Sequence, residues 1–273
     1  MATGKSRCKI QLIDDQSNNT RMLGLITWAI CFFTVNSEPR VTIAGGGLLC
    51  GAGRANDSNF IPLFVQTMED LSYGLNNSNN NFAVKSIDVS TLPPVYALIQ
   101  CHRDLSHSDC LVCYAVIRNA IPNCLPRTSG RYFLDGCFIR YDNYDFFHEA
   151  TDPTTDTRNC NKSLSGTGWR LDFPSVVGDL VENVARLALT SSGFGVMEQK
   201  GVFGLAQCWE SLSNEECRVC LNKAKKEAKG CLPGSPEGRS MNAGCFLRYS
   251  THKFLNHDLR ADASNSFGNL LLF

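Results

Sequence analysis

The sequence feature that most constrains this chain is a cysteine motif that occurs twice. Residues 101–113 have the spacing Cys-x8-Cys-x2-Cys, and residues 208–220 repeat it 107 positions later, each copy directly after a glutamine. Three further pairs of cysteines keep nearly the same offset, namely Cys50 with Cys160, Cys124 with Cys231, and Cys137 with Cys245. Because a fixed internal period sets the number of domains, the chain is predicted to hold two homologous domains of about 105 residues each.

The composition is typical of a globular protein, and it also bears on which classes of partner the chain can bind. Hydrophobic side chains make up 43% of the 273 residues, and Lys plus Arg equal Asp plus Glu at 26 each. A chain with this hydrophobic content can bury a core. Because it is formally neutral and carries no basic run, nucleic acid is not predicted as a partner.

A short apolar run near the N-terminus predicts secretion. Residues 22–35 are uncharged and mainly apolar, they follow Arg21, and small residues lie at 35–37. A run of this length matches the core of a signal peptide and is short for a membrane span. We therefore predict a signal peptide with an extended N-terminal region over residues 1–37. A signal anchor and a buried strand are the alternatives.

The repeat also sets boundaries for the rest of the chain. We expect a lead segment at 38–49, a first domain at 50–150, a linker at 151–159, a second domain at 160–257 and a C-terminal tail at 258–273. The lead segment carries three consecutive glycines at 45–47 and is expected to be flexible. The linker is polar, and the tail is far too short to cross a bilayer.

Hydrophobic periodicity predicts the first helix of each domain. Apolar side chains fall at three- and four-residue spacing over residues 59–73, and Gly74 is expected to end that helix. In the second domain Asp172 is expected to cap the corresponding helix, with Pro174 in its first turn. Both helices are predicted to turn one apolar face to a core.

Capping signals predict a second helix in each domain. The runs Ser106-x-x-Asp109 and Ser213-x-x-Glu216 resemble capping boxes, and they predict helices over 109–121 and 215–229. Apolar runs predict strands, which we expect at residues 95–100, 137–141 and 144–147 and at the equivalent residues 202–207, 245–249 and 253–255. Each domain is therefore predicted to be α+β, with two helices on one antiparallel sheet.

The cysteines admit three interpretations. Removal of residues 1–37 also removes Cys8 and Cys31, which leaves twelve cysteines in two sets of six. Because a secreted chain passes through an oxidising compartment, this even number favours structural disulfides. Zinc would require two Cys-x2-Cys steps about 15–20 residues apart, and no metal site is predicted because here they are much further apart. A redox-active pair is the alternative, since Cys110 and Cys217 stand at predicted helix starts, where thiol pKa values fall.

The sequence offers no set of catalytic residues. The five histidines do not recur at equivalent positions of the repeat; His102, for example, corresponds to Trp209. Motifs of α/β-hydrolases, zinc proteases and phosphate-binding loops are missing. We therefore predict a protein that binds rather than catalyses and uses no cofactor. Sequons for N-glycosylation stand at Asn56, Asn76 and Asn161.

The doubled motif, with each copy ending in Cys-Phe-(Ile/Leu)-Arg-Tyr, resembles the plant stress-antifungal domain typified by ginkbilobin. Tandem copies resemble the ectodomains of cysteine-rich receptor-like kinases, cysteine-rich repeat secretory proteins and plasmodesmata-located proteins. The resemblance covers residues 50 to about 257 and implies five strands and two helices per domain. It also implies the disulfides Cys50–Cys124, Cys101–Cys110, Cys113–Cys137, Cys160–Cys231, Cys208–Cys217 and Cys220–Cys245, which spacing alone does not decide.

The resemblance further implies candidate carbohydrate-binding positions. In ginkbilobin-type lectins mannose is held by an Asn, an Arg and a Glu at fixed distances from the cysteines. The matching positions here are Gly51, Arg131 and Asp142 in the first domain and Asn161, Arg239 and Ser250 in the second. Neither domain carries the full set. The alternative interpretation of Arg131 and Arg239 is as surface residues of strands.

The resemblance implies a non-enzymatic recognition module of the plant apoplast that acts in defence or stress signalling. The sequence shows neither a membrane span after residue 257 nor a kinase signature, so we expect a secreted form of a receptor ectodomain that meets the membrane only through a partner. Expected partners are receptor-like kinases with the same domains, or a cell-wall carbohydrate. An antifungal mannose-binding lectin and a thiol oxidoreductase are the alternatives.

Overall fold

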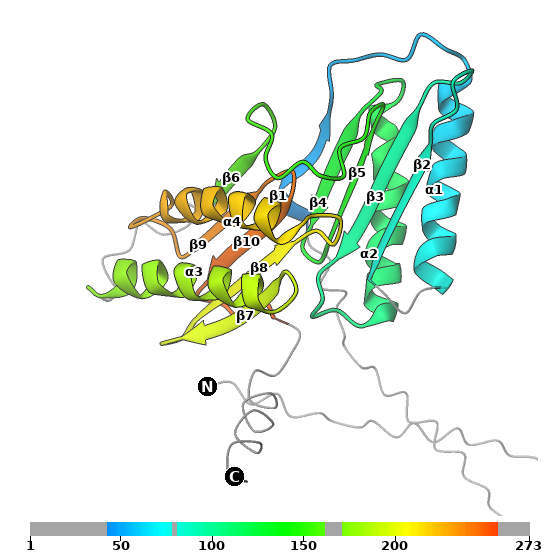
Figure 1. Ribbon diagram of the computed structural model, residues 1–273. Helices are drawn as coiled ribbons and strands as arrows, with labels where there is room; N and C mark the ends of the chain where they lie inside the picture. The colour runs from blue at the N-terminus through cyan, green and yellow to red at the C-terminus, as the bar shows by residue number, and fades with distance from the viewer. Residues whose placement is uncertain (1–42, 78–80, 162–170, 256–273) are drawn as a thin grey trace, which may run out of the picture. The chain divides into compact units, whose positions relative to one another are not determined.

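Each half of the chain forms a five-stranded antiparallel sheet with two helices on one of its faces (Figure 1). The computed structural model describes residues 43–77, 81–161 and 171–255. The predicted signal peptide (1–37) and the C-terminal tail (258–273) lie outside the described residues.

The two halves share one topology, which confirms the predicted α+β fold of two tandem domains. The first half has the strand order β1-β4-β5-β3-β2 and the second half repeats it as β6-β9-β10-β8-β7. The elements of the first half are β1 (Ile43–Cys50), α1 (Phe60–Asn77), β2 (Phe82–Ile87), β3 (Val95–Cys101), α2 (His107–Ala120), a 3₁₀ turn (Ile121–Cys124), β4 (Gly130–Leu134) and β5 (Cys137–Asp142). Those of the second half are β6 (Thr157–Cys160), α3 (Phe173–Thr190), β7 (Phe194–Gln199), β8 (Val202–Cys208), α4 (Asn214–Lys229), β9 (Glu237–Met241) and β10 (Cys245–Ser250).

The capping signals place the second helix of each half correctly. The Ser106 side chain caps α2 by accepting a hydrogen bond from the backbone N–H of Asp109, at 3.1 Å. In α4 the Ser213 side chain and the Glu216 side chain exchange hydrogen bonds with each other's backbone N–H groups, which is a complete capping box. These bonds satisfy N–H groups that have no partner inside the helix.

The first helix of each half differs from prediction at one end. Helix α1 does not end at Gly74 but continues to Asn77; a Cβ atom at Gly74 would lie 3.2 Å from the Cβ atom of Ala83, so this glycine allows close approach of α1 to β2. Asp172 precedes α3 as predicted, but its side chain makes no capping hydrogen bond. Its carboxylate instead lies 3.3 Å from the Lys200 ammonium.

Three predictions about connecting segments are wrong. Most of the expected flexible lead at 38–49 is edge strand β1, which pairs with β4. The register of this pairing shifts between Ile43 and Leu48, where the three glycines lie. The short strands expected at 144–147 and 253–255 do not form; instead Phe146 stacks on Arg140 and Phe254 on Arg248. The linker is shorter than predicted, since residues 157–159 belong to β6. Below, residues 43–150 are the first half, 151–156 the linker, and 157–255 the second half.

Helices and sheet enclose a separate core in each half. The predicted stripe of α1 (Phe60, Phe64, Met68 and Leu71) is fully buried against β3 and β5. Val177, Leu180, Val181 and Val184 of α3 do the same in the second half. The cysteines are joined in the six pairs that the resemblance implies, three in each half: Cys50–Cys124, Cys101–Cys110, Cys113–Cys137, Cys160–Cys231, Cys208–Cys217 and Cys220–Cys245.

The opposite face of each sheet contributes to a third apolar cluster, which contains side chains of both halves. Trp209 stacks on Phe138 with ring centroids 4.7 Å apart, and His102 lies 4.8 Å from Phe246. In the repeat, His102 corresponds to Trp209 and Phe138 to Phe246. The two contacts are therefore reciprocal, as in the isologous interface of a symmetric dimer.

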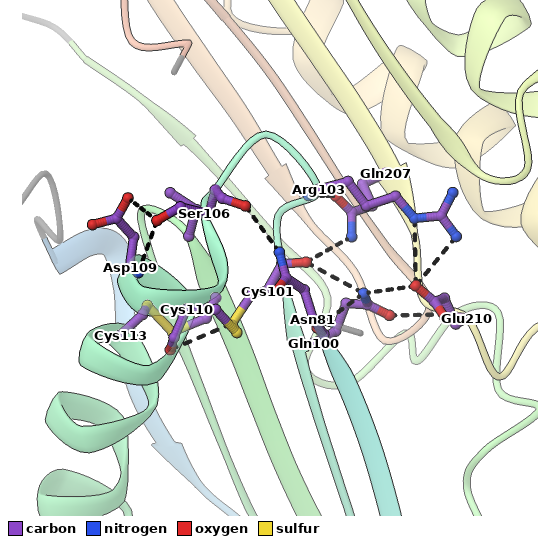
Figure 2. Close-up of a disulfide and its surroundings, with 12 residues drawn as sticks. Asn81, Gln100, Cys101, Arg103, Ser106, Asp109, Cys110, Cys113, Gln207 and Glu210 are labelled. Atoms are coloured by element: carbon purple, nitrogen blue, oxygen red, sulfur yellow. Dashed lines mark hydrogen bonds and ion pairs between the residues drawn. A yellow bond between two sulfur atoms is a disulfide. The ribbon is translucent and has the colours of Figure 1, made fainter. Parts of the chain in front are cut away.

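Hydrogen bonds between the halves follow the same reciprocity (Figure 2). The Oε1 atom of Gln100 accepts from the Glu210 N–H, and the Oε1 atom of Gln207 accepts from the Arg103 N–H, both at 3.0 Å. Arg103 and Glu210 also occupy equivalent positions, and their side chains form an ion pair at 3.2 Å. The glutamine that precedes each cysteine motif thus serves the contact between the halves.

Candidate functional site

Two arginines face each other across neighbouring strands in each half. Arg131 of β4 lies opposite Arg140 of β5, and Arg239 of β9 lies opposite Arg248 of β10. Arg140 stacks over Phe146 at 4.1 Å, and Arg248 stacks over Phe254 at 4.0 Å. A buried charge requires a partner of opposite charge, so the carboxylates around each arginine pair determine whether its guanidinium groups are fully paired.

The arginine pair of the second half lies between two carboxylates, although the buried Nε atom of Arg248 makes no hydrogen bond within the described residues. Asp135, from the turn between β4 and β5 of the first half, lies 2.8 Å from Arg239 and 3.2 Å from Arg248. Glu237 lies 2.6 Å and 2.9 Å from the same two side chains. The residue equivalent to Asp135 in the second half is Ala243, so that position provides no carboxylate for the arginine pair of the first half.

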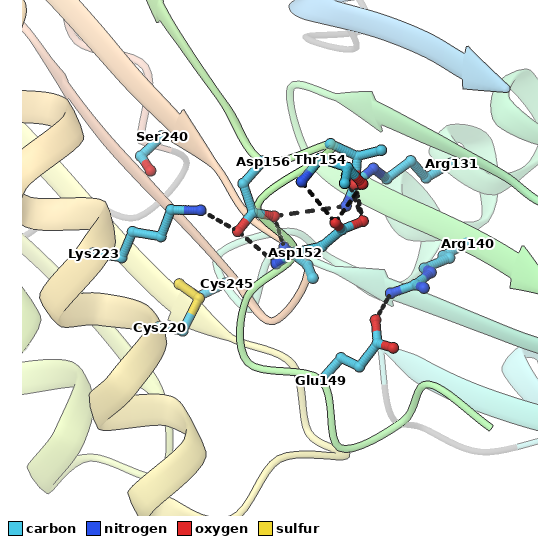
Figure 3. Close-up of polar contacts among 12 residues, drawn as sticks. Arg131, Arg140, Glu149, Asp152, Thr154, Asp156, Cys220, Lys223, Ser240 and Cys245 are labelled. Carbon is cyan, nitrogen blue, oxygen red and sulfur yellow. Dashed lines mark hydrogen bonds and ion pairs between the residues drawn. A yellow bond between two sulfur atoms is a disulfide. The ribbon is translucent and has the colours of Figure 1, made fainter. Parts of the chain in front are cut away.

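The arginine pair of the first half is satisfied unevenly (Figure 3). Arg140 lies 2.9 Å from Asp142 and 2.7 Å from Glu149. Arg131 reaches only the linker carboxylates of Asp152 and Asp156, at 3.5 Å and 3.7 Å, and its buried Nη1 atom makes no hydrogen bond within the described part of the chain. Arg131 is therefore the less satisfied cation of the two.

The pKa values of the two arginines differ in the same way as their contacts with carboxylates. Burial and the neighbouring charge of Arg140 lower the pKa of Arg131. Burial also acts to lower the pKa of Arg140, but the hydrogen bonds and charges of Glu149 and Asp142 outweigh it and raise that pKa. Burial raises the pKa of Asp142. Burial would raise that of Asp152 too, but hydrogen bonds from Thr154 and Thr155 hold it at about 2.

A pocket of about 400 Å³ opens beside the arginine pair of the first half. Its walls come from β1, β4 and β5 and from the linker, and the side chains that line it are mostly polar: Ser129, Arg131, Arg140, Asp142, Tyr144, Asp152, Thr154 and Thr155. Hydroxyls, guanidinium groups and carboxylates in one cavity present both donors and acceptors of hydrogen bonds. Such a lining suits a small, strongly polar ligand.

The structure brings the three candidate positions of the first half together in this pocket, because Gly51, Arg131 and Asp142 all line it. At Gly51 an added Cβ atom would lie 1.9 Å from the Ser129 Oγ atom, so the Ser129 hydroxyl would have to rotate away to admit the amide side chain of the lectin pattern. Asp142 does not point freely into the pocket, because its carboxylate accepts hydrogen bonds from Arg140 and from the Asn143 N–H.

The candidate residues of the second half are held in other contacts. Arg239 is held by Asp135 and Glu237, Ser250 is buried, and exposed Asn161 donates its backbone N–H to the Glu237 carbonyl. The interpretation of Arg131 and Arg239 as surface residues is wrong, since their side chains are only 5% and 13% exposed. Both arginines belong to ion-pair networks that the sequence does not reveal.

The remaining candidate residues are the cysteines at the helix starts and the asparagines of the sequons. Cys110 and Cys217 are buried and bonded to Cys101 and Cys208, not to the cysteine three positions on. Thiol exchange requires an accessible sulfur, so the oxidoreductase alternative gains no support. The sequon residues Asn56, Asn76 and Asn161 are all exposed.

The described residues 43–77, 81–161 and 171–255 contain neither a candidate metal site nor a candidate membrane span. No group of three or more His, Cys, Asp or Glu side chains there could hold a metal ion. None of the helices in those ranges is both long and apolar enough to span a bilayer.

Comparison with known proteins gives the family. The model of the salt stress response/antifungal family matches residues 49–144 and again residues 157–252. The chain belongs to this family. The second matched segment includes the edge strand β6, whereas the first begins at residue 49 and includes only the end of β1.

Similar proteins include receptor-like kinases. Over 226 residues the chain is 48% identical to cysteine-rich receptor-like protein kinase 42 of Arabidopsis thaliana, a match that covers 82% of this chain and 33% of that protein. It is 39% identical to cysteine-rich receptor-like protein kinase 2 of the same plant, over 74% of this chain and 31% of that protein. The chain thus spans about a third of the length of these relatives and matches only that part of them.

A solved structure shares the tandem fold. The tandem DUF26 ectodomain of the Arabidopsis thaliana cysteine-rich receptor-like protein PDLP8 superposes with a TM-score of 0.66 at 21% identity. The match covers 77% of this chain and 98% of that ectodomain. At this identity the similarity shows the tandem fold alone.

Sequence reasoning missed several residues that shape the site. Arg140 and Arg248 stand inside the repeated motif Cys-Phe-(Ile/Leu)-Arg-Tyr, so their recurrence was a usable signal. Asp135 and Asp156 have no acidic counterpart in the repeat, and only the fold shows that they lie against arginines. Tyr144 also lines the pocket, and its sequence context predicts only a strand.

Proposed function

We propose that the chain is an extracellular recognition module of the plant apoplast, with residues 1–37 as its signal peptide and no catalytic activity of its own. Its role would lie in defence or stress signalling, in the manner of a receptor-like kinase ectodomain. The expected macromolecular partner is a receptor-like kinase that carries the same tandem domains.

The observation that carries this proposal is the set of six disulfides. Ten of the twelve paired cysteines are buried within the two cores, so the bonds are part of the folded structure and not surface adducts. Disulfides of this kind form and persist in oxidising compartments. A domain of about 105 residues also gains from them, because a small core alone gives marginal stability.

The polar pocket of the first half supports a ligand-binding role. Ser129, Thr154 and Tyr144 place hydroxyl groups in the pocket wall, beside the guanidinium groups of Arg131 and Arg140. Arg131 and Arg140 are outnumbered by Asp142, Glu149, Asp152 and Asp156, which disfavours an anionic ligand. A neutral, polyhydroxylated molecule suits both the charge and the mixed lining, and this favours a carbohydrate as the second candidate for what the module recognises.

The test is a binding experiment on the secreted full chain with a matched pair of variants. A panel of methyl glycosides and cell-wall oligosaccharides is titrated by calorimetry against wild type, Tyr144→Ala and Tyr73→Ala. Tyr144 lines the pocket and is 46% exposed, whereas Tyr73 is an exposed tyrosine of α1 on the other face of the sheet. We expect binding to be lost in Tyr144→Ala alone.

Two outcomes would count against the proposal. Twelve reactive thiols in the secreted protein would remove the basis for an extracellular module. Binding that is equal in Tyr144→Ala and in Tyr73→Ala would place recognition elsewhere on the molecule.

A further inference from the structure

One wall of the pocket belongs to neither sheet. Asp152, Thr154 and Thr155 line it, and all three lie on the linker between the halves (Figure 3). The wall is internally ordered, because the Asp152 carboxylate accepts hydrogen bonds from the Thr154 N–H at 2.9 Å and from both threonine hydroxyls. A linker wall can serve a binding site only if something fixes it in place.

Asp156 provides that attachment. Its side chain is fully buried, and it does not itself line the pocket. Within the linker, its Oδ2 atom accepts from the Asp152 N–H at 2.8 Å, and its own N–H donates to the Asp152 carbonyl at 2.8 Å. Asp152 and Asp156 thus close a small loop with the two threonines inside it.

The other partners of Asp156 come mainly from the second half. Lys223 of α4 donates to its Oδ2 atom at 2.6 Å, and the Ala243 N–H, in the turn between β9 and β10, donates to Oδ1 at 2.7 Å. The guanidinium of Arg131 from the first half lies 3.7 Å from the same Oδ1 atom. Charge-assisted bonds of this length are the strong ones, so the second half determines where the linker wall lies.

We propose that Lys223 and the Ala243 amide are positioning groups for the pocket of the first half. They hold Asp156, which holds the loop from Asp152 to Thr155 against Arg131. The pocket is complete only while the two halves are in contact, and a ligand that contacts its linker wall stabilises that contact in return. The ligand part of this inference rests on the proposed function; the positioning part does not.

The repeat supports a role that is specific to this site. The residue equivalent to Lys223 in the first half is Val116, an exposed apolar side chain on α2. A lysine needed only for the solubility or stability of α4 would not have to reach the linker. On the same helix Lys225 pairs with Glu182 of α3 at 2.8 Å, away from the linker, which makes it a matched control.

The test compares Lys223→Met with Lys225→Met in the full chain by hydrogen exchange of the linker amides. We expect exchange of the Asp152 and Asp156 amides to rise about tenfold in Lys223→Met and to stay at the wild-type rate in Lys225→Met. Lys223→Arg should restore protection, because it keeps a cation within reach. Asp156→Asn is the second variant; it keeps the shape, loses the charge and should resemble Lys223→Met.

Equal linker exchange in Lys223→Met and Lys225→Met would overturn the proposal, as would failure of Lys223→Arg to restore protection. A binding arm uses methyl α-mannoside as the probe, with affinity expected to fall in Lys223→Met and not in Lys225→Met. If wild type binds neither this probe nor any other carbohydrate of the panel, the carbohydrate candidate for the pocket fails, and the exchange comparison still decides the positioning role.

Discussion

Replacing Asp135 with alanine tests how the second half depends on the first. The Asp135 carboxylate is 9% exposed and lies between the guanidinium groups of Arg239 and Arg248, which are 13% and 11% exposed. Burial lowers the pKa of Arg248, and Asp135 is the largest influence that opposes this. Without the carboxylate, two buried cations share Glu237 alone.

The magnitude follows from the cost of leaving a buried charge without its partner. Removing one member of a buried ion pair typically costs about 3–5 kcal/mol. Glu237 remains within 2.9 Å of both arginines, so we expect a loss near the lower end, about 3 kcal/mol. Part of it should return in Asp135→Ala/Arg248→Met, because the second change removes one of the unpaired charges.

The assay is urea unfolding of the oxidised protein, followed by circular dichroism, with the free energy of unfolding taken from the midpoint and slope. The control is Asp70→Ala, which breaks the half-exposed pair with Lys85 at 3.0 Å and should cost no more than about 1 kcal/mol. If Asp135→Ala costs no more than Asp70→Ala, the carboxylate is not a structural ligand of the second half, and the reasoning about the arginine pairs is refuted.

Two more predictions concern the linker and the contact between the halves. The pKa of Asp152 is held at about 2 against an ordinary 3.8, so its ionised form contributes stability above pH 3.8 that is lost as the pH falls toward 2. Asp152→Asn should therefore lose less stability than wild type over that interval in urea titrations; an identical acid response in both proteins would contradict this. Trp209→Ala should cost about 3–5 kcal/mol by the same assay, because it removes a buried ring stacked on Phe138. A cost below about 1 kcal/mol would mean that this stack does not hold the halves together.

Local signals in the sequence predicted much of each half. The repeat, the stripe on α1 and the serine caps depend on near neighbours in the chain, so their physics is visible in the sequence. Gly74 misled the prediction because it serves a close helix–strand approach and not a helix end. The glycines of β1 likewise led to a wrong prediction, because such a run of glycines indicates a flexible segment, whereas an irregular edge strand forms there.

The polar networks of the site could not be predicted, because they join residues far apart in the chain. Arg131 and Arg239 read as surface residues of strands until the fold places carboxylates from other segments against them. The acid that serves the second half comes from a turn of the first, 104 positions before Arg239. Nothing in the repeat signals this, because the two halves differ at that position.

The central claim is that two halves, each cross-linked by its own three disulfides, act as one recognition body and are held together through equivalent faces of their sheets. Differential scanning calorimetry of the oxidised full chain tests it most directly. We predict a single transition whose calorimetric and van't Hoff enthalpies agree. Two separate transitions, one for each half, would contradict the claim and with it the dependence of the first pocket on the second half.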